Sequence, residues 1–267
     1  MNKSKERIKL NAEVFTPEWL IDQMLDQLPQ HVWKDENLTW LEPAAGNGNM
    51  IVRIAQRRLE AGQSPKAILS TIKAIELMED NAIFARARLL EALGLSNDPE
   101  AIDLVETSIQ QGSFLEYNEE AQYDVIVANP PYQIKKPNQR KSTTIWDKFV
   151  IKSLEHLSEG GYMTQVHPPG WRNVSGQYTK VKDAFLSRRL LYLQMHDLKD
   201  GQKAFGASTP YDFYVLHNLP ANGTKTNIKC IDGTNDQRCL EKWSFIPGGM
   251  FDQIRALLAE DPEADND

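Results

Sequence analysis

The segment Asn129-Pro-Pro-Tyr132 carries the strongest chemical signal in this 267-residue chain. Two consecutive prolines are stiff and lack backbone donors, so nearby carbonyl groups are fixed in direction and free to accept hydrogen bonds. The side chain of Asn129 adds another carbonyl oxygen. These acceptors suit an amino group with two hydrogens, and Tyr132 offers a flat face for stacking. The alternative is a plain proline turn. The candidate catalytic residues are Asn129, Pro130, Pro131 and Tyr132.

A glycine-containing segment, Glu42-Pro-Ala-Ala-Gly-Asn-Gly48, follows the first apolar run of the chain. After the first strand of a doubly wound sheet, glycines let a nucleotide-like ligand approach the backbone closely. The alternative is an ordinary turn between a strand and a helix. Glu76 ends the next apolar run, where its carboxylate could accept hydrogen bonds from two ribose hydroxyls. Together these residues predict a cofactor site at one edge of a sheet.

Short apolar runs alternate with amphipathic stretches, a pattern typical of a mostly parallel sheet covered by helices on both faces. An additional helix precedes the first run, with Thr16 as its expected N-cap and Pro17 in its first turn. The fold class is therefore α/β. The pattern predicts seven strands, at residues 38–42, 71–76, 102–106, 123–128, 161–166, 190–194 and 211–217.

The alternation of apolar and amphipathic segments ends after residue 219, where Pro220, Asn222 and Gly223 mark a break. We expect a catalytic domain over residues 1–219. A small extension over 220–267 would contain a hairpin (226–231 with 237–243), a helix (249–259) and an acidic, mobile tail.

The composition is that of a soluble globular protein, with 41% hydrophobic and 25% charged residues. No apolar run approaches the roughly 20 residues needed to span a bilayer, and the first ten residues lack the apolar stretch of a signal peptide. We expect a cytoplasmic protein. Cys230 and Cys239 have no metal-type spacing, which predicts reduced thiols and no metal site.

The formal net charge of −7 argues weakly against a nucleic-acid partner. Part of this charge belongs to the acidic end of the chain, whereas residues 133–152 hold six basic residues and one acidic residue. This basic strip could contact phosphates, or it could be a solvated loop and helix face. Its members are Lys135, Lys136, Arg140, Lys141, Lys148 and Lys152.

In order and spacing these motifs resemble the gamma-class N6-adenine DNA methyltransferases, the Asn-Pro-Pro-Tyr family that includes Eco57I-like and type I and II restriction-modification methylases. Val14-Phe-Thr-Pro17 looks like the motif ahead of strand one, Glu42 to Gly48 like the cofactor loop, and Asn129 to Tyr132 like the catalytic tetrapeptide. The resemblance covers about residues 12 to 217. It implies a Rossmann-like S-adenosylmethionine methyltransferase fold and S-adenosyl-L-methionine as cofactor.

The resemblance also implies roles for individual residues. Thr16 and its neighbours would hold the methionine end of the cofactor, Glu42 would lie near its ammonium group, and Glu76 would hold its ribose. Where the family often has an acidic or amide residue that reads the cofactor adenine, this chain has Ser113, although Phe114 could still line that pocket. The cofactor-binding candidates are Phe15, Thr16, Pro17, Glu42, Pro43, Ala44, Gly46, Gly48, Glu76, Leu77, Ser113 and Phe114.

The implied reaction is direct transfer of a methyl group to the N6 atom of an adenine that is rotated out of double-stranded DNA. Related enzymes methylate adenine in RNA or the side-chain amide of a protein glutamine, and a catalytically silent subunit could keep the same fold.

Substrate-binding candidates are Lys135, Lys136, Arg140, Lys141, Trp171 and Arg172, with core packing as the alternative for Trp171. Little chain follows residue 217, so site recognition would come from the hairpin, from a partner specificity subunit or homodimer, or from a missing domain.

Overall fold

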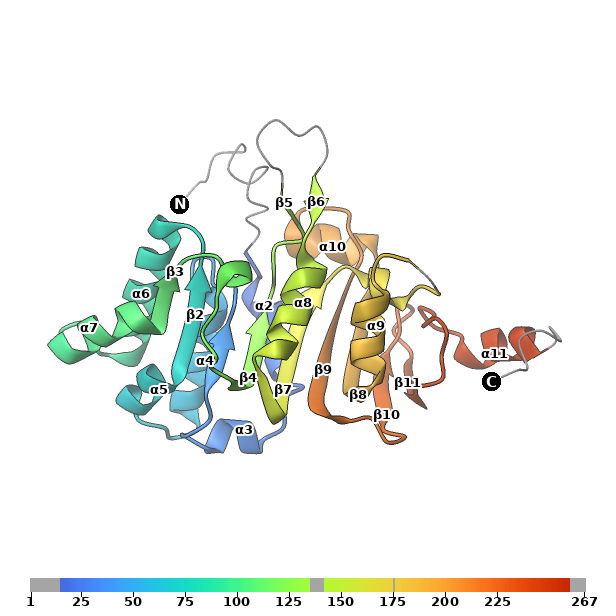
Figure 1. Cartoon of the computed structure of the whole chain (residues 1–267), viewed down its shortest axis with the longest axis horizontal. Helices are drawn as coiled ribbons and strands as arrows, with labels where there is room; N and C mark the ends of the chain where they lie inside the picture. Colours follow the sequence, from blue (N-terminus) through green and yellow to red (C-terminus); the bar gives the residue numbers. More distant parts are fainter. Residues whose placement is uncertain (1–14, 135–141, 175, 260–267) are drawn as a thin grey trace.

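The computed structural model describes residues 15–134, 142–174 and 176–259, which form an α/β fold around one nine-stranded sheet (Figure 1). Its strands lie in the order β11-β10-β8-β9-β7-β4-β1-β2-β3. The α/β class is confirmed, but the sheet has nine strands where seven were expected. The strands are β1 (Trp40–Glu42), β2 (Ile72–Glu76), β3 (Ile109–Gln111), β4 (Tyr123–Ala128), β7 (Leu157–His167), β8 (Arg188–His196), β9 (Tyr211–Pro220), β10 (Lys225–Lys229) and β11 (Asn235–Cys239).

The two additional strands are those of the expected hairpin. β10 pairs in parallel with β8 and antiparallel with β11, so the hairpin continues the main sheet. Most of the other neighbours are parallel, and β9 runs antiparallel to both β7 and β8. The division into domains 1–219 and 220–267 stays a prediction.

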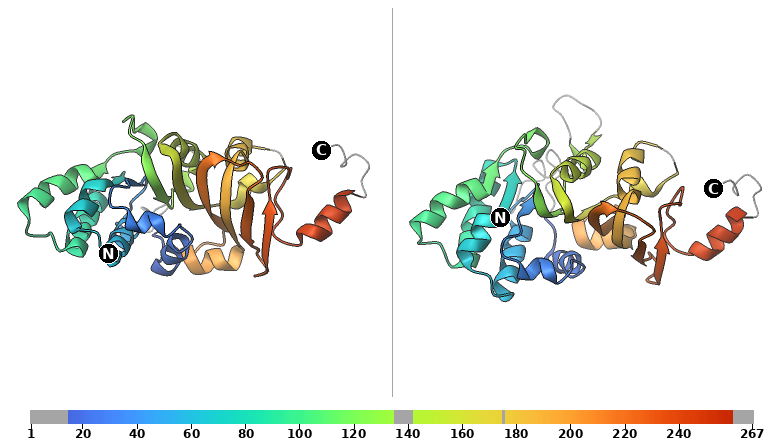
Figure 2. Two further views of the ribbon diagram at one scale, coloured as in Figure 1. Left: turned by 90° about the horizontal axis from the view of Figure 1, so that it is seen from below. Right: turned by 60° about the horizontal axis from the view of Figure 1, so that its bottom comes forward.

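Helices cover both faces of the sheet (Figure 2). Side chains alternate between the faces along each strand, so Val125 and Val127 of β4 enter one core while Ile126 enters the other. The first core packs against α2 (Glu18–Leu25), α4 (Asn49–Glu60), α5 (Pro65–Thr71), α6 (Glu79–Leu93) and α7 (Pro99–Ser108). The second packs against α8 (Trp146–Glu155), α9 (Thr179–Leu186) and the start of α11 (Phe251–Ala259).

The prediction of a strand at 102–106 is wrong, because these residues lie in α7. Asp98 caps this helix by accepting hydrogen bonds from the backbone of Glu100 and Ala101, and Pro99 occupies its first turn. The helix buries Ala101, Val105 and Ser108, which are spaced three to four residues apart. The true third strand, β3, follows immediately.

Thr16 is not the N-cap of α2, which is a second correction. Pro17 holds the cap position in an extended conformation and provides no side-chain hydrogen bond to the helix. The hydroxyl of Thr16 instead contacts another part of the chain, described below. Helix α2 is fixed to α4 by Asp22, whose carboxylate forms ion pairs of 2.7 Å with both Arg53 and Arg57.

Smaller elements complete the fold. They are α3 (His31–Lys34), η1 (Phe114–Glu116), the short pair β5 (Gln133–Ile134) and β6 (Thr143–Thr144), η2 (Pro169–Arg172) and α10 (Leu198–Phe205). β5, β6 and α10 all lie at the carboxyl edge of β4 (Figure 1). Within the described ranges, no helix combines the length and apolar character needed to cross a bilayer.

Candidate active site

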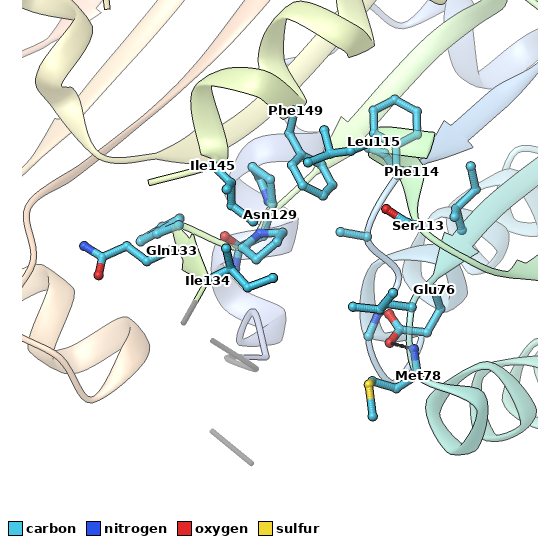
Figure 3. Close-up of a pocket in the computed structure, with 18 of the residues that line it drawn as sticks. Glu76, Met78, Ser113, Phe114, Leu115, Asn129, Gln133, Ile134, Ile145 and Phe149 are labelled. Atoms are coloured by element: carbon cyan, nitrogen blue, oxygen red, sulfur yellow. Dashed lines mark hydrogen bonds between the residues drawn. The ribbon is translucent and has the colours of Figure 1, made fainter. Parts of the chain in front are cut away.

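A cavity of about 220 Å³ opens at the carboxyl ends of β1, β2 and β4 (Figure 3). In parallel α/β sheets this edge is where ligands bind. The cavity joins the two groups of residues that the sequence singles out, the glycine loop with Glu76 and the tetrapeptide. Its walls are formed by Phe15, Pro43, Ala44, Gly46, Ile75, Glu76, Leu77, Met78, Gly112, Ser113, Phe114, Leu115, Asn129, Pro130, Pro131, Tyr132, Gln133, Ile134, Ile145, Phe149, Phe205, Ala207 and Thr209.

Hydrogen bonds connect the glycine loop, Glu42 to Gly48, with Glu76 at the carboxyl end of β2. The backbone N–H of Gly46 donates to Oε2 of Glu76 at 2.7 Å, and the N–H of Met78 donates to Oε1 at 2.9 Å. The side-chain amide of Asn81 donates to Oε1 as well, at 3.2 Å. These donors fix the Glu76 carboxylate in the cavity wall (Figure 3), at the strand tip where the sequence predicts a ribose contact.

Glu42 lies beneath the loop, outside the cavity lining, and its side chain is only 2% exposed. Burial raises the pKa of its carboxyl well above the usual range, and the nearby negative charge of Glu76 acts in the same direction. Its Oε2 atom has no hydrogen-bond partner among the described residues. A cationic group at this place would satisfy that oxygen and stabilise the ionised form.

An apolar slot extends from Glu76 towards η1. Phe114 is buried, forms a tilted pair with Phe149 of α8 at 5.6 Å, and lines the cavity together with Leu77 and Leu115. Ser113, at the position where the sequence resemblance implies a residue that reads the cofactor adenine, lines the same wall. The slot can accept a flat ring, with the serine as its polar neighbour.

All four residues of the tetrapeptide line the cavity, because β4 ends at Ala128 and directs the loop across the sheet edge. The side-chain amide nitrogen of Asn129 donates to Oγ1 of Thr16 at 2.9 Å. The ring of Tyr132 meets that of Phe205 edge to face, with centroids 6.1 Å apart. The Tyr132 hydroxyl is buried without a partner in the described part of the chain, and burial raises its pKa.

Several lining residues were not expected from the sequence. Phe205, Ala207 and Thr209 come from the end of α10 and the turn after it. Ile134 belongs to β5, Ile145 directly precedes α8, and Phe149 lies within α8. Close packing holds this turn, since a Cβ atom on Gly201 of α10 would collide with the carbonyl oxygen of Thr209. One sequence feature could have indicated that a helix ends at this wall. Phe205 is followed by Gly206, which ends α10 in the left-handed conformation.

Four cofactor candidates lie outside the lining: Glu42, described above, and Thr16, Pro17 and Gly48. Gly48 instead caps α4 with a φ of +84°, and Thr16 contacts Asn129. The basic residues Lys135, Lys136, Arg140 and Lys141 fall outside the described residues.

Trp171 and Arg172 do not line the cavity, so their expected place in a base cleft does not fit the structure. Trp171 is 1% exposed and packs edge to face on Phe185, as its packing alternative had it. Arg172 forms a 2.9 Å ion pair with the buried Asp212. Burial raises the pKa of Asp212 to about 6.

A Gly48→Ala substitution is expected to weaken, about 10-fold, the binding of the S-adenosylmethionine that the sequence resemblance implies. A Cβ atom at this position would lie 2.9 Å from Cβ of Ala85 in α6, and the positive φ disfavours a side chain by roughly 1–2 kcal/mol. Both effects displace the loop. Isothermal titration with S-adenosylmethionine measures the loss of affinity.

Gly94→Ala is the matched control, because Gly94 ends α6 with a φ of +69° and has open space around it. It should lower the unfolding temperature and leave cofactor affinity unchanged. Equal loss of affinity in both variants would mean that global strain, and not the Gly48 loop, governs binding.

Comparison with known proteins reveals a consistent set of similarities. Residues 48–205, more than half of the chain, match the family model described as Eco57I restriction-modification methylase. The type II methyltransferase M.VspI of Vibrio sp. (strain 343) is 25% identical over 245 residues, which cover 85% of this chain and 54% of that protein.

Solved structures share the fold. A modification subunit of a putative type I restriction enzyme from Vibrio vulnificus YJ016 superposes with a TM-score of 0.60 at 15% identity, over 93% of this chain and 53% of that one. A putative class I S-adenosylmethionine-dependent methyltransferase from Listeria monocytogenes gives a TM-score of 0.51 at 14% identity, over 80% and 65%. The chain thus spans about half the length of the two Vibrio proteins.

Proposed function

This chain belongs to the Eco57I restriction-modification methylase family, and on that premise we propose that it transfers a methyl group from S-adenosyl-L-methionine to the exocyclic N6 of an adenine in DNA. One observation carries the proposal: the Asn129-Pro-Pro-Tyr132 loop and the Glu76 strand tip line the same cavity. A cofactor bound at one wall would therefore meet a planar amine held at the other.

The residues of the cavity fit this cofactor. Glu76 would accept hydrogen bonds from the ribose hydroxyls, and Phe114 and Leu77 would enclose the adenine ring with Ser113 beside it. Glu42 lies outside the lining, and its buried Oε2, which has no partner among the described residues, would pair with the ammonium group. Bound in this way, S-adenosylmethionine supplies an electrophilic methyl group next to the tetrapeptide.

The tetrapeptide would prepare the nucleophile. The side-chain oxygen of Asn129 and the carbonyl of Pro130 would accept the two hydrogens on N6, which favours the pyramidal amine and stabilises the positive charge that develops on it. Tyr132 would stack on the base and offset part of the few kcal/mol needed to rotate it out of the duplex. Neither cysteine has a role, because direct transfer needs no covalent enzyme intermediate.

The decisive experiment is methyl transfer from tritiated S-adenosylmethionine into unmethylated genomic DNA, with total RNA and cell protein in parallel, followed by nucleoside mass spectrometry. N6-methyladenine in DNA alone is the expected product. Label in RNA or in a protein glutamine would overturn the substrate. Binding of the cofactor without any labelled product would favour a silent subunit or a requirement for a specificity subunit or second copy.

The basic strip after Tyr132 is proposed to contact DNA phosphates. Changing Lys135, Lys136, Arg140 and Lys141 to alanine should reduce the steepness of the log affinity against log salt plot by about 2–4, because each phosphate contact releases close to one counterion. Fluorescence anisotropy of labelled DNA measures the slope. Lys34→Ala with Lys66→Ala, on α3 and α5 at the opposite sheet edge, is the control and should leave it unchanged. An unchanged slope in the four-residue variant would exclude these four residues as phosphate contacts.

A further inference from the structure

A hydrogen bond joins two motifs that lie 113 residues apart. The amide nitrogen Nδ2 of Asn129 donates to Oγ1 of Thr16 at 2.9 Å, and Thr16 is only 6% exposed. A side-chain amide has a donor end and an acceptor end. With its nitrogen bound to Thr16, the amide directs its oxygen elsewhere, and Asn129 lines the cavity.

We propose that Thr16 is a positioning residue that sets the orientation of the Asn129 amide, so that its oxygen and not its nitrogen faces the substrate amine. The inference rests on the proposed function. A flipped amide would present its own hydrogens to the hydrogens of an exocyclic amine, and the site would lose an acceptor and gain a repulsion. By accepting a hydrogen bond from Nδ2, the Thr16 hydroxyl holds the amide in the orientation that leaves Oδ1 for the substrate amine.

Thr16 is itself held by the loop on the cofactor side. Its backbone carbonyl accepts from Nδ2 of Asn49 at 3.2 Å, and Oδ1 of Asn49 accepts from Nη1 of Arg88 at 2.7 Å. The same Arg88 nitrogen donates to the carbonyl of Asn47 at 2.8 Å. A continuous hydrogen-bonded path thus runs from α6 through the first residue of α4 to Asn129.

This assignment differs from a cofactor contact by Thr16, and the two make different predictions. Thr16 lies outside the cavity lining, and its hydroxyl faces the tetrapeptide. Loss of a cofactor contact would raise the dissociation constant for S-adenosylmethionine. Loss of amide positioning would lower kcat and leave that constant unchanged.

Three variants test the proposal. Thr16→Val keeps the shape and removes the acceptor, so kcat should fall about 10-fold while cofactor affinity stays within about threefold. Thr16→Ser keeps the hydroxyl and should restore most of the rate. Thr226→Val removes another buried hydroxyl, which donates to the Leu190 carbonyl far from the cavity, and should leave kcat unchanged. Wild-type kcat in Thr16→Val, or a loss confined to cofactor affinity, would overturn the proposal.

A measurement without turnover separates this inference from the proposed function. The side-chain amide resonances of Asn129, assigned in ¹⁵N-labelled protein by their absence in Asn129→Ala, should shift in Thr16→Val and stay in place in Thr226→Val. Unshifted resonances contradict the positioning role whatever product is formed. Shifted resonances in a protein that methylates RNA or a protein glutamine, and not DNA, support the hydrogen bond and contradict the proposed function.

Discussion

Replacement of Asn129 by alanine is expected to lower kcat for methyl transfer about 10³-fold and to change cofactor affinity less than about threefold. The substitution removes the one side-chain oxygen that would accept from N6, an electrostatic contribution of the size lost when a single oxyanion donor is deleted. Asn129 lies on the wall opposite Glu76 and the Gly46 loop, so the cofactor side should be unaffected. Single-turnover transfer and isothermal titration measure the two quantities.

Two further variants define what the Asn129 result means. Asn37→Ala, in the loop before β1, removes an exposed asparagine whose side chain, among the described residues, bonds only to nearby Asp35, and it should retain full activity. Asn129→Asp keeps an oxygen in the cavity and can accept a hydrogen from the Thr16 hydroxyl, so it should be more active than the alanine variant. An alanine variant that transfers methyl at the normal rate would remove Asn129 from the mechanism.

The parts of the site predicted from sequence are those fixed by local chain geometry. A tetrapeptide with two prolines after a buried strand can lie only at the strand's carboxyl end, and the same holds for the glycine loop and for Glu76. The structure places these three segments around one cavity. These segments are far apart in the sequence, but their proximity could still be predicted, because the carboxyl ends of parallel strands lie at the same edge of the sheet.

The missed parts depend on tertiary packing. Strand β3 has only three residues, too few for an alternating pattern, whereas residues 102–106 look apolar enough for a strand and are helical because Asp98 and Pro99 start a helix. The wall formed by Phe205 and Thr209 exists because Gly201 lets the following turn pack closely. No single-sequence pattern marks such a contact.

Thr16 and Trp171 show the same limit for single side chains. A threonine before a proline suits a helix N-cap, but bonding to Asn129 takes its place. Trp171 follows a Pro-Pro-Gly segment that suggested a cleft, yet its ring is enclosed by the second core. In both cases the outcome depends on a residue brought close only by the folded sheet.

Tyr132→Ala is expected to lower kcat/KM about 10- to 100-fold, whereas Tyr132→Phe should stay within about threefold of wild type. Stacking on an aromatic ring contributes roughly 1–3 kcal/mol per base, and phenylalanine keeps it. The hydroxyl has no hydrogen-bond partner among the described residues, so its removal leaves none of them with an unsatisfied polar group. Initial rates on an oligonucleotide carrying the site identified from the methylated genome give the comparison.

Stacking by Tyr132 also predicts how the same variants respond to a mispaired target adenine. If Tyr132 offsets the cost of rotating the base out of the duplex, a mispaired target adenine, which is already destabilised, should recover part of the rate lost in Tyr132→Ala. Recovery should be absent in Asn129→Ala, where the defect lies in the chemical step. Equal recovery in both variants would contradict the division of labour between stacking and activation. A Tyr132→Phe enzyme as slow as Tyr132→Ala would show that the hydroxyl, and not the ring face, carries the role of this residue.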